Sequence, residues 1–176
     1  MTPKQIERIQ KKIKKIKAEM AADKKRWGGV HDDSRGLRYL PPELYIKIED
    51  YTGGLRYINW FDKNFPDDMG FPIFLFEWAL ILFKKNRIDE AEAKVIAVFN
   101  LNPYVLDTFL GNPIEKFPIN HWSPITTPEY AGECLNYSHT QPNCIDFADW
   151  LQVFIQRAKF QEAKMRRIQK GSYKLK

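Results

Sequence analysis

The chain of 176 residues is poor in cysteine and has no apolar run long enough to cross a bilayer. Two cysteines with nine residues between them do not make a disulfide framework, so we interpret them as reduced thiols. The longest apolar run, Phe71 to Phe83, is interrupted by Glu77 and is too short for a membrane span. No apolar segment of a secretory signal follows the first lysines. We therefore expect a cytoplasmic protein.

The motifs of common catalytic sites are also missing. The sequence has no glycine-rich phosphate loop, no nucleophile elbow and no H-E-x-x-H pair. Four serines lie in no recognisable triad context: Ser34, Ser123, Ser138 and Ser172. We therefore expect no enzyme and no cofactor. The alternative that stays open is a site assembled from residues far apart in the sequence.

Possible metal ligands are present, but their spacing is unfavourable. Four of them fall within 24 residues: His121, Cys134, His139 and Cys144. They lack the close pairs that hold a zinc ion locally, so we interpret them as two buried thiols and two loop histidines. The segment His31-Asp32-Asp33 is interpreted as a solvated loop that supplies a helix cap. The sequence therefore predicts no metal site.

What the chain does have is positive charge at both ends. Residues 1–26 carry ten Lys and Arg against three Asp and Glu, and residues 157–176 carry eight against one. Each end has a net charge of +7, and the whole chain has +6, so the segment between them carries −8. An acidic body with two basic ends suggests that the ends meet an anionic partner or the body's own acidic surface.

Helical patterns cover most of the chain. Ile6, Ile9, Ile13, Ile16 and Met20 alternate three and four residues apart, which predicts an amphipathic helix over 4–26 with one narrow apolar seam. Residues 30–42 are predicted as a loop. Further helices are expected over 42–50, 54–64, 72–85, 88–100, 104–110, 128–137 and 145–170, with an irregular connection over 111–127. A short strand over 45–48 is the alternative within this all-α fold.

Two segments match each other without a gap at a spacing of 37 residues. The first runs from Tyr45 to Pro66 and the second from Leu82 to Pro103. A small residue, Gly54 or Ala91, is followed by apolar residues four and seven positions later and by Pro twelve positions later. Such a repeat predicts units that bury their apolar faces by stacking on each other.

These paired segments resemble the tetratricopeptide repeat (TPR), a helix-turn-helix unit. The second copy matches best, at Ala79, Leu82, Ala91, Val95, Val98 and Pro103, and the first matches at Tyr45, Tyr51, Gly54, Ile58, Phe61 and Pro66. The resemblance implies a short stack of two repeat units over 30–110. A basic helix over 1–29 would precede the stack, and residues 111–176 would pack on the same core.

Members of this family bind peptides along the concave face of their first helices. The equivalent positions here are Ile73, Phe76, Leu80, Phe83 and Lys84 in the second copy, and Tyr39, Glu43, Ile46 and Lys47 in the first. A groove lined by so many apolar residues is unfavourable in contact with water, so we expect it to be covered. The cover would be residues 4–26, the C-terminal helix or a partner helix. The resemblance thus implies a non-catalytic protein-binding module, in which Lys47 and Lys84 select acidic side chains.

The alternative function is nucleic-acid or ribosome binding through the basic ends. The candidate phosphate contacts are Lys11, Lys12, Lys14, Lys15, Lys17, Lys24, Lys25, Arg26, Lys164, Arg166, Arg167 and Lys170. The competing interpretation is a pair of solvated helix faces. A membrane partner is not expected, because the N-terminal seam has no bulky aromatic residue before Trp27.

Overall fold

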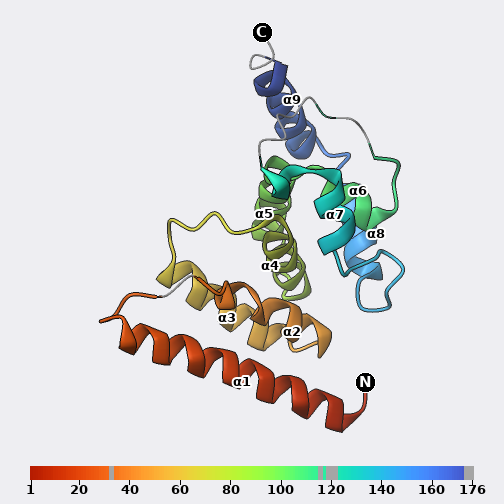
Figure 1. Cartoon of the computed structure of the whole chain (residues 1–176). Helices are drawn as coiled ribbons and strands as arrows, with labels where there is room; N and C mark the ends of the chain where they lie inside the picture. The colour runs from red at the N-terminus through yellow and green to blue at the C-terminus, as the bar shows by residue number, and fades with distance from the viewer. Residues whose placement is uncertain (32–33, 115–116, 118–122, 173–176) are drawn as a thin grey trace. The chain divides into compact units, whose positions relative to one another are not determined.

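The computed structural model describes residues 1–31, 34–114, 117 and 123–172, except for the side chains of 170–172. Within these residues the secondary structure is helical and no β-strand occurs, which confirms the all-α prediction (Figure 1). The chain divides into two compact units, residues 1–70 and 71–176. The division falls inside segment 30–110, so the two repeat copies belong to different units. Within the described residues, no helix combines the length and apolar character that a bilayer span needs.

The first unit begins with the longest of its helices, α1 (Pro3–Arg26). Thr2 and Gln5 form a capping box at its start: the Thr2 side chain accepts from the Gln5 amide, and the Gln5 side chain accepts from the Thr2 amide at 2.8 Å. Three basic residues occupy the last turn, where the helix dipole favours positive charge. The predicted helix over 4–26 is therefore confirmed.

The first repeat copy forms a pair of packed helices, α2 (Pro41–Lys47) and α3 (Tyr51–Asn64), preceded by the short 3₁₀ helix η1 (Leu37–Tyr39). The strand alternative for 45–48 is wrong, since residues 45–47 lie in α2. The predicted helix over 42–50 ends earlier because Glu49 adopts a left-handed conformation with φ of 56°. Asp50 then caps α3 by accepting from the Gly53 amide at 2.8 Å, so α3 starts three residues before the predicted position.

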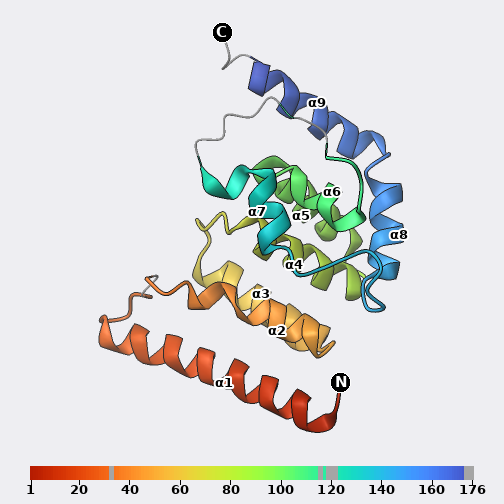
Figure 2. The same cartoon turned by 45° about the vertical axis from the view of Figure 1, so that its right-hand side comes forward.

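Helix α1 folds back onto the first repeat copy, and the second half of its apolar seam is buried in this contact. Its residues Ile13, Ile16 and Met20 form one core cluster with Leu44, Tyr45 and Tyr57. In Figures 1 and 2 α1 runs beside α2 and α3 along its length. One candidate cover for the apolar faces, residues 4–26, therefore packs on α2 and η1 of its own unit.

The second unit is built on the packed pair α4 (Pro72–Lys84) and α5 (Ile88–Leu101), which is the second repeat copy. A tight turn joins the two helices, with Asn86 at φ of 57°. Helix α4 is apolar on nearly every side and buries ten of its residues, from Pro72 to Leu82. A helix that is apolar all round must be surrounded by other elements.

Buried Asn102 holds the irregular connection against the end of α5. Its side-chain amide donates to the carbonyls of Ile125 and Thr127 at 2.9 and 3.0 Å, and its oxygen accepts from the Tyr104 amide at 2.9 Å. Helix α6 (Tyr104–Leu110) starts there, and η2 (Pro124–Thr126) and α7 (Pro128–Cys134) follow the connection. Helix α7 ends three residues before the predicted Tyr137, because Leu135 is extended.

The prediction of one helix over 145–170 is wrong. The chain forms α8 (Ile145–Phe154) and α9 (Ala158–Ser172), with a break at residues 155–157 (Figure 2). Phe154 and Phe160 would point about 120° apart on a straight helix. With the break, both rings are buried and lie 5.7 Å apart. The buried carboxylate of Glu92 in α5 fixes the start of α9 through Arg157 at 3.1 Å and Lys159 at 2.6 Å.

Candidate functional site

The outward side of α1 is strongly basic. Because its seam faces Leu44, Tyr45 and Tyr57, its charged residues face the solvent. Nine basic side chains of α1 are exposed: Lys4, Arg8, Lys11, Lys12, Lys14, Lys15, Lys17, Lys25 and Arg26. Lys24 is half-buried. The sequence analysis predicted eight of these ten as phosphate contacts, and the structure brings those eight onto one helix.

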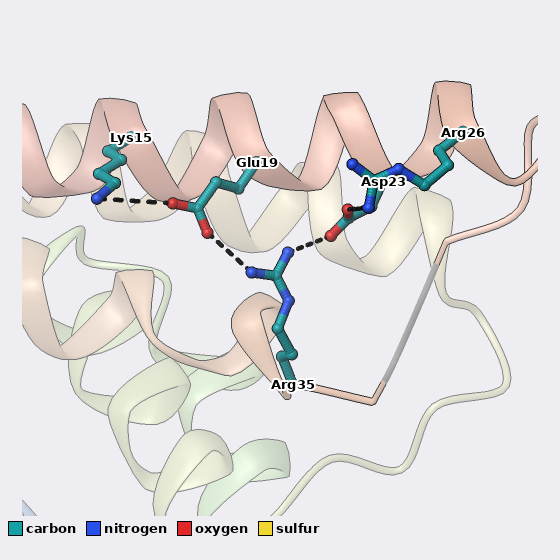
Figure 3. Close-up of polar contacts among 5 residues, drawn as sticks. All are labelled: Lys15, Glu19, Asp23, Arg26 and Arg35. Carbon is teal, nitrogen blue, oxygen red and sulfur yellow. Dashed lines mark hydrogen bonds and ion pairs between the residues drawn. The ribbon is translucent and has the colours of Figure 1, made fainter.

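Two of the three carboxylates of α1, those of Glu19 and Asp23, are bound by an arginine from outside the helix. Arg35, in the loop after α1, contacts Glu19 at 3.1 Å and also pairs with Asp23 (Figure 3). The same carboxylates lie farther from the basic residues of α1 itself, with Lys15 at 3.9 Å from Glu19 and Arg26 at 4.0 Å from Asp23. These two carboxylates raise the pKa of Arg35, chiefly because Asp23 accepts a hydrogen bond from its guanidinium.

Several lysines of α1 have no carboxylate partner among the residues that the structure describes. In that part of the chain, Lys11 pairs with Glu7 at 2.7 Å. No described carboxylate lies within 4.0 Å of the ammonium groups of Lys12, Lys14, Lys17 or Lys25. The positive charge of this surface is therefore only partly neutralised by the unit itself, and an anionic ligand can approach it from solvent.

A cavity of about 290 Å³ lies next to this surface, inside the first unit. Its lining combines aromatic rings, the apolar side chains of α1 and two lysines: Lys17, Met20, Ala21, Lys24, His31, Tyr57, Trp60 and Asn64. Lys17 and Lys24 are seven positions apart, so they lie on the same side of α1 and roughly 10 Å apart along its axis. The cavity is near the lower limit of volumes that hold small ligands.

His31, one of the residues that line this cavity, has a buried polar atom. Its ring lies 4.7 Å from Phe65 and 5.8 Å from Trp60, between centroids. Burial lowers the pKa of His31 below its ordinary value of 6.5, and the positive charges of Lys24 and Arg38 add to the effect. Its Nε2 is shielded from solvent, and no described residue forms a hydrogen bond with it. The predicted loop position of His31 is confirmed, but its ring is packed and half-buried where a solvated loop was expected. Asp32 and Asp33 lie outside the described residues.

The second-copy positions of the predicted groove lie under the chain's own helices. Phe76 and Leu80 are fully buried. The Phe76 ring lies 4.9 Å from that of Phe109 in α6, 5.6 Å from that of Tyr137 and 5.7 Å from that of Phe147 in α8. Phe83, half-buried, lies 5.3 Å from Phe147 and 5.0 Å from Trp150. Ile73 is also half-buried. Helices α6 and α8 thus cover this apolar face.

Lys84 and Lys47, which were predicted to select acidic side chains of a partner, lie in different environments. Lys84 is nearly buried, and its Nζ lies 2.5 Å from Oδ1 of Asp146, so an acid of the same unit already pairs with it. Lys47, in the first unit, is exposed.

The other first-copy positions take part in the packing of their own unit. Ile46 is buried, and Glu43 is half-buried. Tyr39 donates to Asp68 at 2.6 Å, and its pKa is raised to about 12 by burial and by this hydrogen bond.

The basic residues of α9 make more contacts with aromatic rings and acids of their own unit than those of α1 do. The guanidinium of Arg167 lies 6.0 Å from the Phe99 ring, and burial lowers its pKa. Lys164 lies 5.6 Å from the Phe117 ring, and Arg166 is 3.5 Å from Glu162. The side chain of Lys170 lies outside the described residues. Because two of these cations cover aromatic rings, α9 offers fewer free charges than α1.

The three possible metal ligands that the structure describes, Cys134, His139 and Cys144, do not form a metal-binding group. Cys134 is exposed, whereas Cys144 is buried, so only one of the two thiols is buried as predicted. His139 is bound to the Phe109 carbonyl at 3.2 Å, and His121 lies outside the described residues. Among the described side chains, no group of three His, Cys, Asp or Glu residues is placed to hold a metal ion.

Sequence reasoning missed Arg35 and the cavity residues of α3. Arg35 lies in a loop without periodicity, and no pattern links it to carboxylates 12 and 16 positions earlier. Tyr57, Trp60 and Asn64 follow the spacing of three and four that places residues on one helix face, which could have indicated a shared surface. Comparison with protein-family models, with curated proteins and with solved structures found no match.

Proposed function

We propose that the protein is a non-catalytic binding module whose helix α1 docks on the phosphate backbone of a nucleic acid. The observation that carries this proposal is the exposed row of basic side chains on α1, a helix in which Arg35 binds two of the three carboxylates. Lysines that lack carboxylate partners neutralise phosphates and release counterions, which favours association.

The packing of α1 favours this ligand over a lipid bilayer. A helix that binds in the membrane interface inserts its apolar face among the lipid tails. Here Ile13, Ile16 and Met20 are buried in the core of the first unit and Ile9 packs against it, so most of the apolar face is not available to lipid. The exposed side chains of α1 are mainly charged, and such a surface suits a hydrated polyanion.

Binding of a protein segment in the repeat groove is the competing proposal. Supporting it are the packed pairs α2–α3 and α4–α5, which we propose to be TPR-like units, and the burial of the small residues Ala79 and Ala91. It is less favoured because Phe76 and Leu80 are covered by the unit's own helices and Lys84 pairs with Asp146. A partner would have to displace these elements.

The test is a triple substitution on α1, Lys12→Gln, Lys14→Gln and Lys25→Gln, with Lys→Arg at the same positions as the charge-preserving control. Affinity for a fluorescent RNA is measured by anisotropy at several salt concentrations. The Gln variant is expected to bind more weakly, with a log–log salt slope shallower by about 2, while the Arg variant keeps the slope. Equal binding by all three proteins would refute the proposal.

A further inference from the structure

The cavity between α1 and α3 has the chemistry of a site for one unpaired nucleobase. Three aromatic rings contribute to its lining, those of His31, Tyr57 and Trp60. The Tyr57 and Trp60 rings lie 5.3 Å apart and are tilted by 38°. Proteins that bind single strands hold bases by stacking them on such rings, and this stacking tolerates any base.

The same lining supplies groups for the polar parts of a nucleotide. Lys17 and Lys24 stand on the α1 side, in line with the basic surface on which we propose that the phosphate backbone docks. Asn64 offers both a donor and an acceptor, although its amide nitrogen donates to the Trp60 carbonyl at 2.7 Å. A cavity that joins aromatic rings to cations fits a base with its phosphate better than it fits a purely apolar ligand.

His31, in the lining of the cavity, has one ring nitrogen without a hydrogen-bond partner in the described part of the chain. Nε2 of His31 is shielded from solvent and has no hydrogen-bond partner among the described residues. A buried polar atom without a partner is unfavourable, and a rotation of the His31 ring that turned Nε2 toward the cavity would let it pair with the donors and acceptors at the edge of a base. The lowered pKa of His31 keeps the ring neutral at pH 7, so one nitrogen donates and the other accepts.

From these features we infer that the cavity binds one unstacked base of a single-stranded nucleic acid while α1 holds the flanking phosphates. This inference rests on the proposed function and narrows its ligand from any nucleic acid to single strands. A base within a duplex is stacked between its neighbours and does not enter the cavity. The protein should therefore bind single strands more tightly than duplexes of the same length.

The experiment compares three ligands of equal length, about 12 nucleotides: an oligouridine, an RNA duplex and an abasic single strand. Two variants of the full-length protein alter the cavity. Trp60→Leu removes a ring, and Ala21→Phe fills the cavity from an exposed position of α1 without removing a core contact. Trp60→Phe is the matched control that keeps an aromatic surface. Thermal unfolding followed by circular dichroism checks that each variant is folded.

We expect Trp60→Leu and Ala21→Phe to weaken binding of the oligouridine about tenfold and to leave the duplex, the abasic strand and the salt slope unchanged. Trp60→Phe should bind the oligouridine nearly as the original protein does. If Trp60→Leu fails to fold, Ala21→Phe decides alone. Unchanged oligouridine binding in Ala21→Phe, or equal binding of the three ligands by the original protein, would overturn the inference. Either result leaves the proposed function standing as long as the lysine substitutions on α1 still weaken binding, so the two failures are distinguishable.

Discussion

Arg35 donates from the loop after α1 to Asp23, whose side chain is only 11% exposed. The same guanidinium reaches Glu19 one turn earlier, so it joins the loop to the C-terminal half of the helix. Its two arms suit this geometry, because a guanidinium offers several donors in a fixed plane. The contact both anchors α1 and withdraws two carboxylates from its lysines.

Replacing Arg35 should therefore loosen the end of α1. We expect Arg35→Gln to lower the melting temperature of the protein, because Asp23 would be left nearly buried without its main cation. The melting temperature of Arg35→Lys should lie between those of the original protein and of Arg35→Gln, because one ammonium group cannot bind both carboxylates in the bidentate way of a guanidinium. Arg56→Gln, at an exposed position of α3, is the control. A melting temperature that responds equally to Arg35→Gln and Arg56→Gln would contradict the anchoring role.

The lowered pKa of His31 makes stability depend on pH. In the unfolded chain His31 takes up a proton near pH 6.5, whereas in the folded protein it does so only at lower pH. The unfolded state therefore binds more protons in this interval, and the free energy of unfolding falls as pH drops below 6.5. Denaturation in urea at about pH 7.5 and about pH 5.5 measures the difference. His31→Gln should reduce it, and an unchanged pH dependence in that variant would show that another group is responsible.

Leu80 tests whether α4 is part of a packed interior. Because its side chain is fully buried, Leu80→Ala should lower the free energy of unfolding by about 2–5 kcal/mol. Val153→Ala, at a position of α8 that is 56% exposed, should change it by less than about 0.5 kcal/mol. Urea denaturation of the full chain gives both values. If Leu80→Ala had no larger effect than Val153→Ala, the face of α4 that contains Leu80 would be exposed to solvent, as the groove hypothesis requires.

Two glycines in helices should respond to alanine in opposite ways. A Cβ atom on Gly53 would lie 2.6 Å from Cε1 of Tyr45 and would also meet the Asp50 carboxylate, which caps α3. Gly53→Ala should therefore destabilise the protein by about 1–3 kcal/mol. At Gly132 in α7 the added atom would meet nothing within 4 Å, and Gly132→Ala should stabilise by about 0.5–1 kcal/mol. The stability of both variants is measured by thermal unfolding. A change of the same sign in both would contradict the packing described around Gly53 and Gly132.

The helices could be predicted from sequence where one periodic pattern and its capping residues agree. Residues 4–26 show this best, since the isoleucine spacing predicted both the helix and its buried face. The break after Phe154 could not be predicted in this way, because residues on both sides continue a helical pattern. What ends α8 is the burial of Phe160 and the attraction of Arg157 and Lys159 to Glu92, some 65 residues away. Periodicity carries no information about such distant partners.

The candidate site was predictable only in part, for the same physical reason. The basic composition of residues 1–26 identified the lysines of α1, which depend on local sequence alone. The cavity depends on how α1 lies against α3, and it brings together Lys17, His31 and Trp60 from three separate segments. The resemblance to a repeat family placed one half of the groove on α4, but it could not reveal that the rings of Phe109 and Phe147 cover Phe76.

The central claim is that the charges of α1 bind phosphates, and a salt titration of the unmodified protein tests it most directly. Affinity for a labelled single-stranded RNA is measured between about 50 and 200 mM salt. If about six lysines and arginines contact phosphates, the log–log slope should be near −4, since each contact to a single strand contributes about −0.7. A slope near zero, or no measurable binding at about 50 mM salt, would contradict the account.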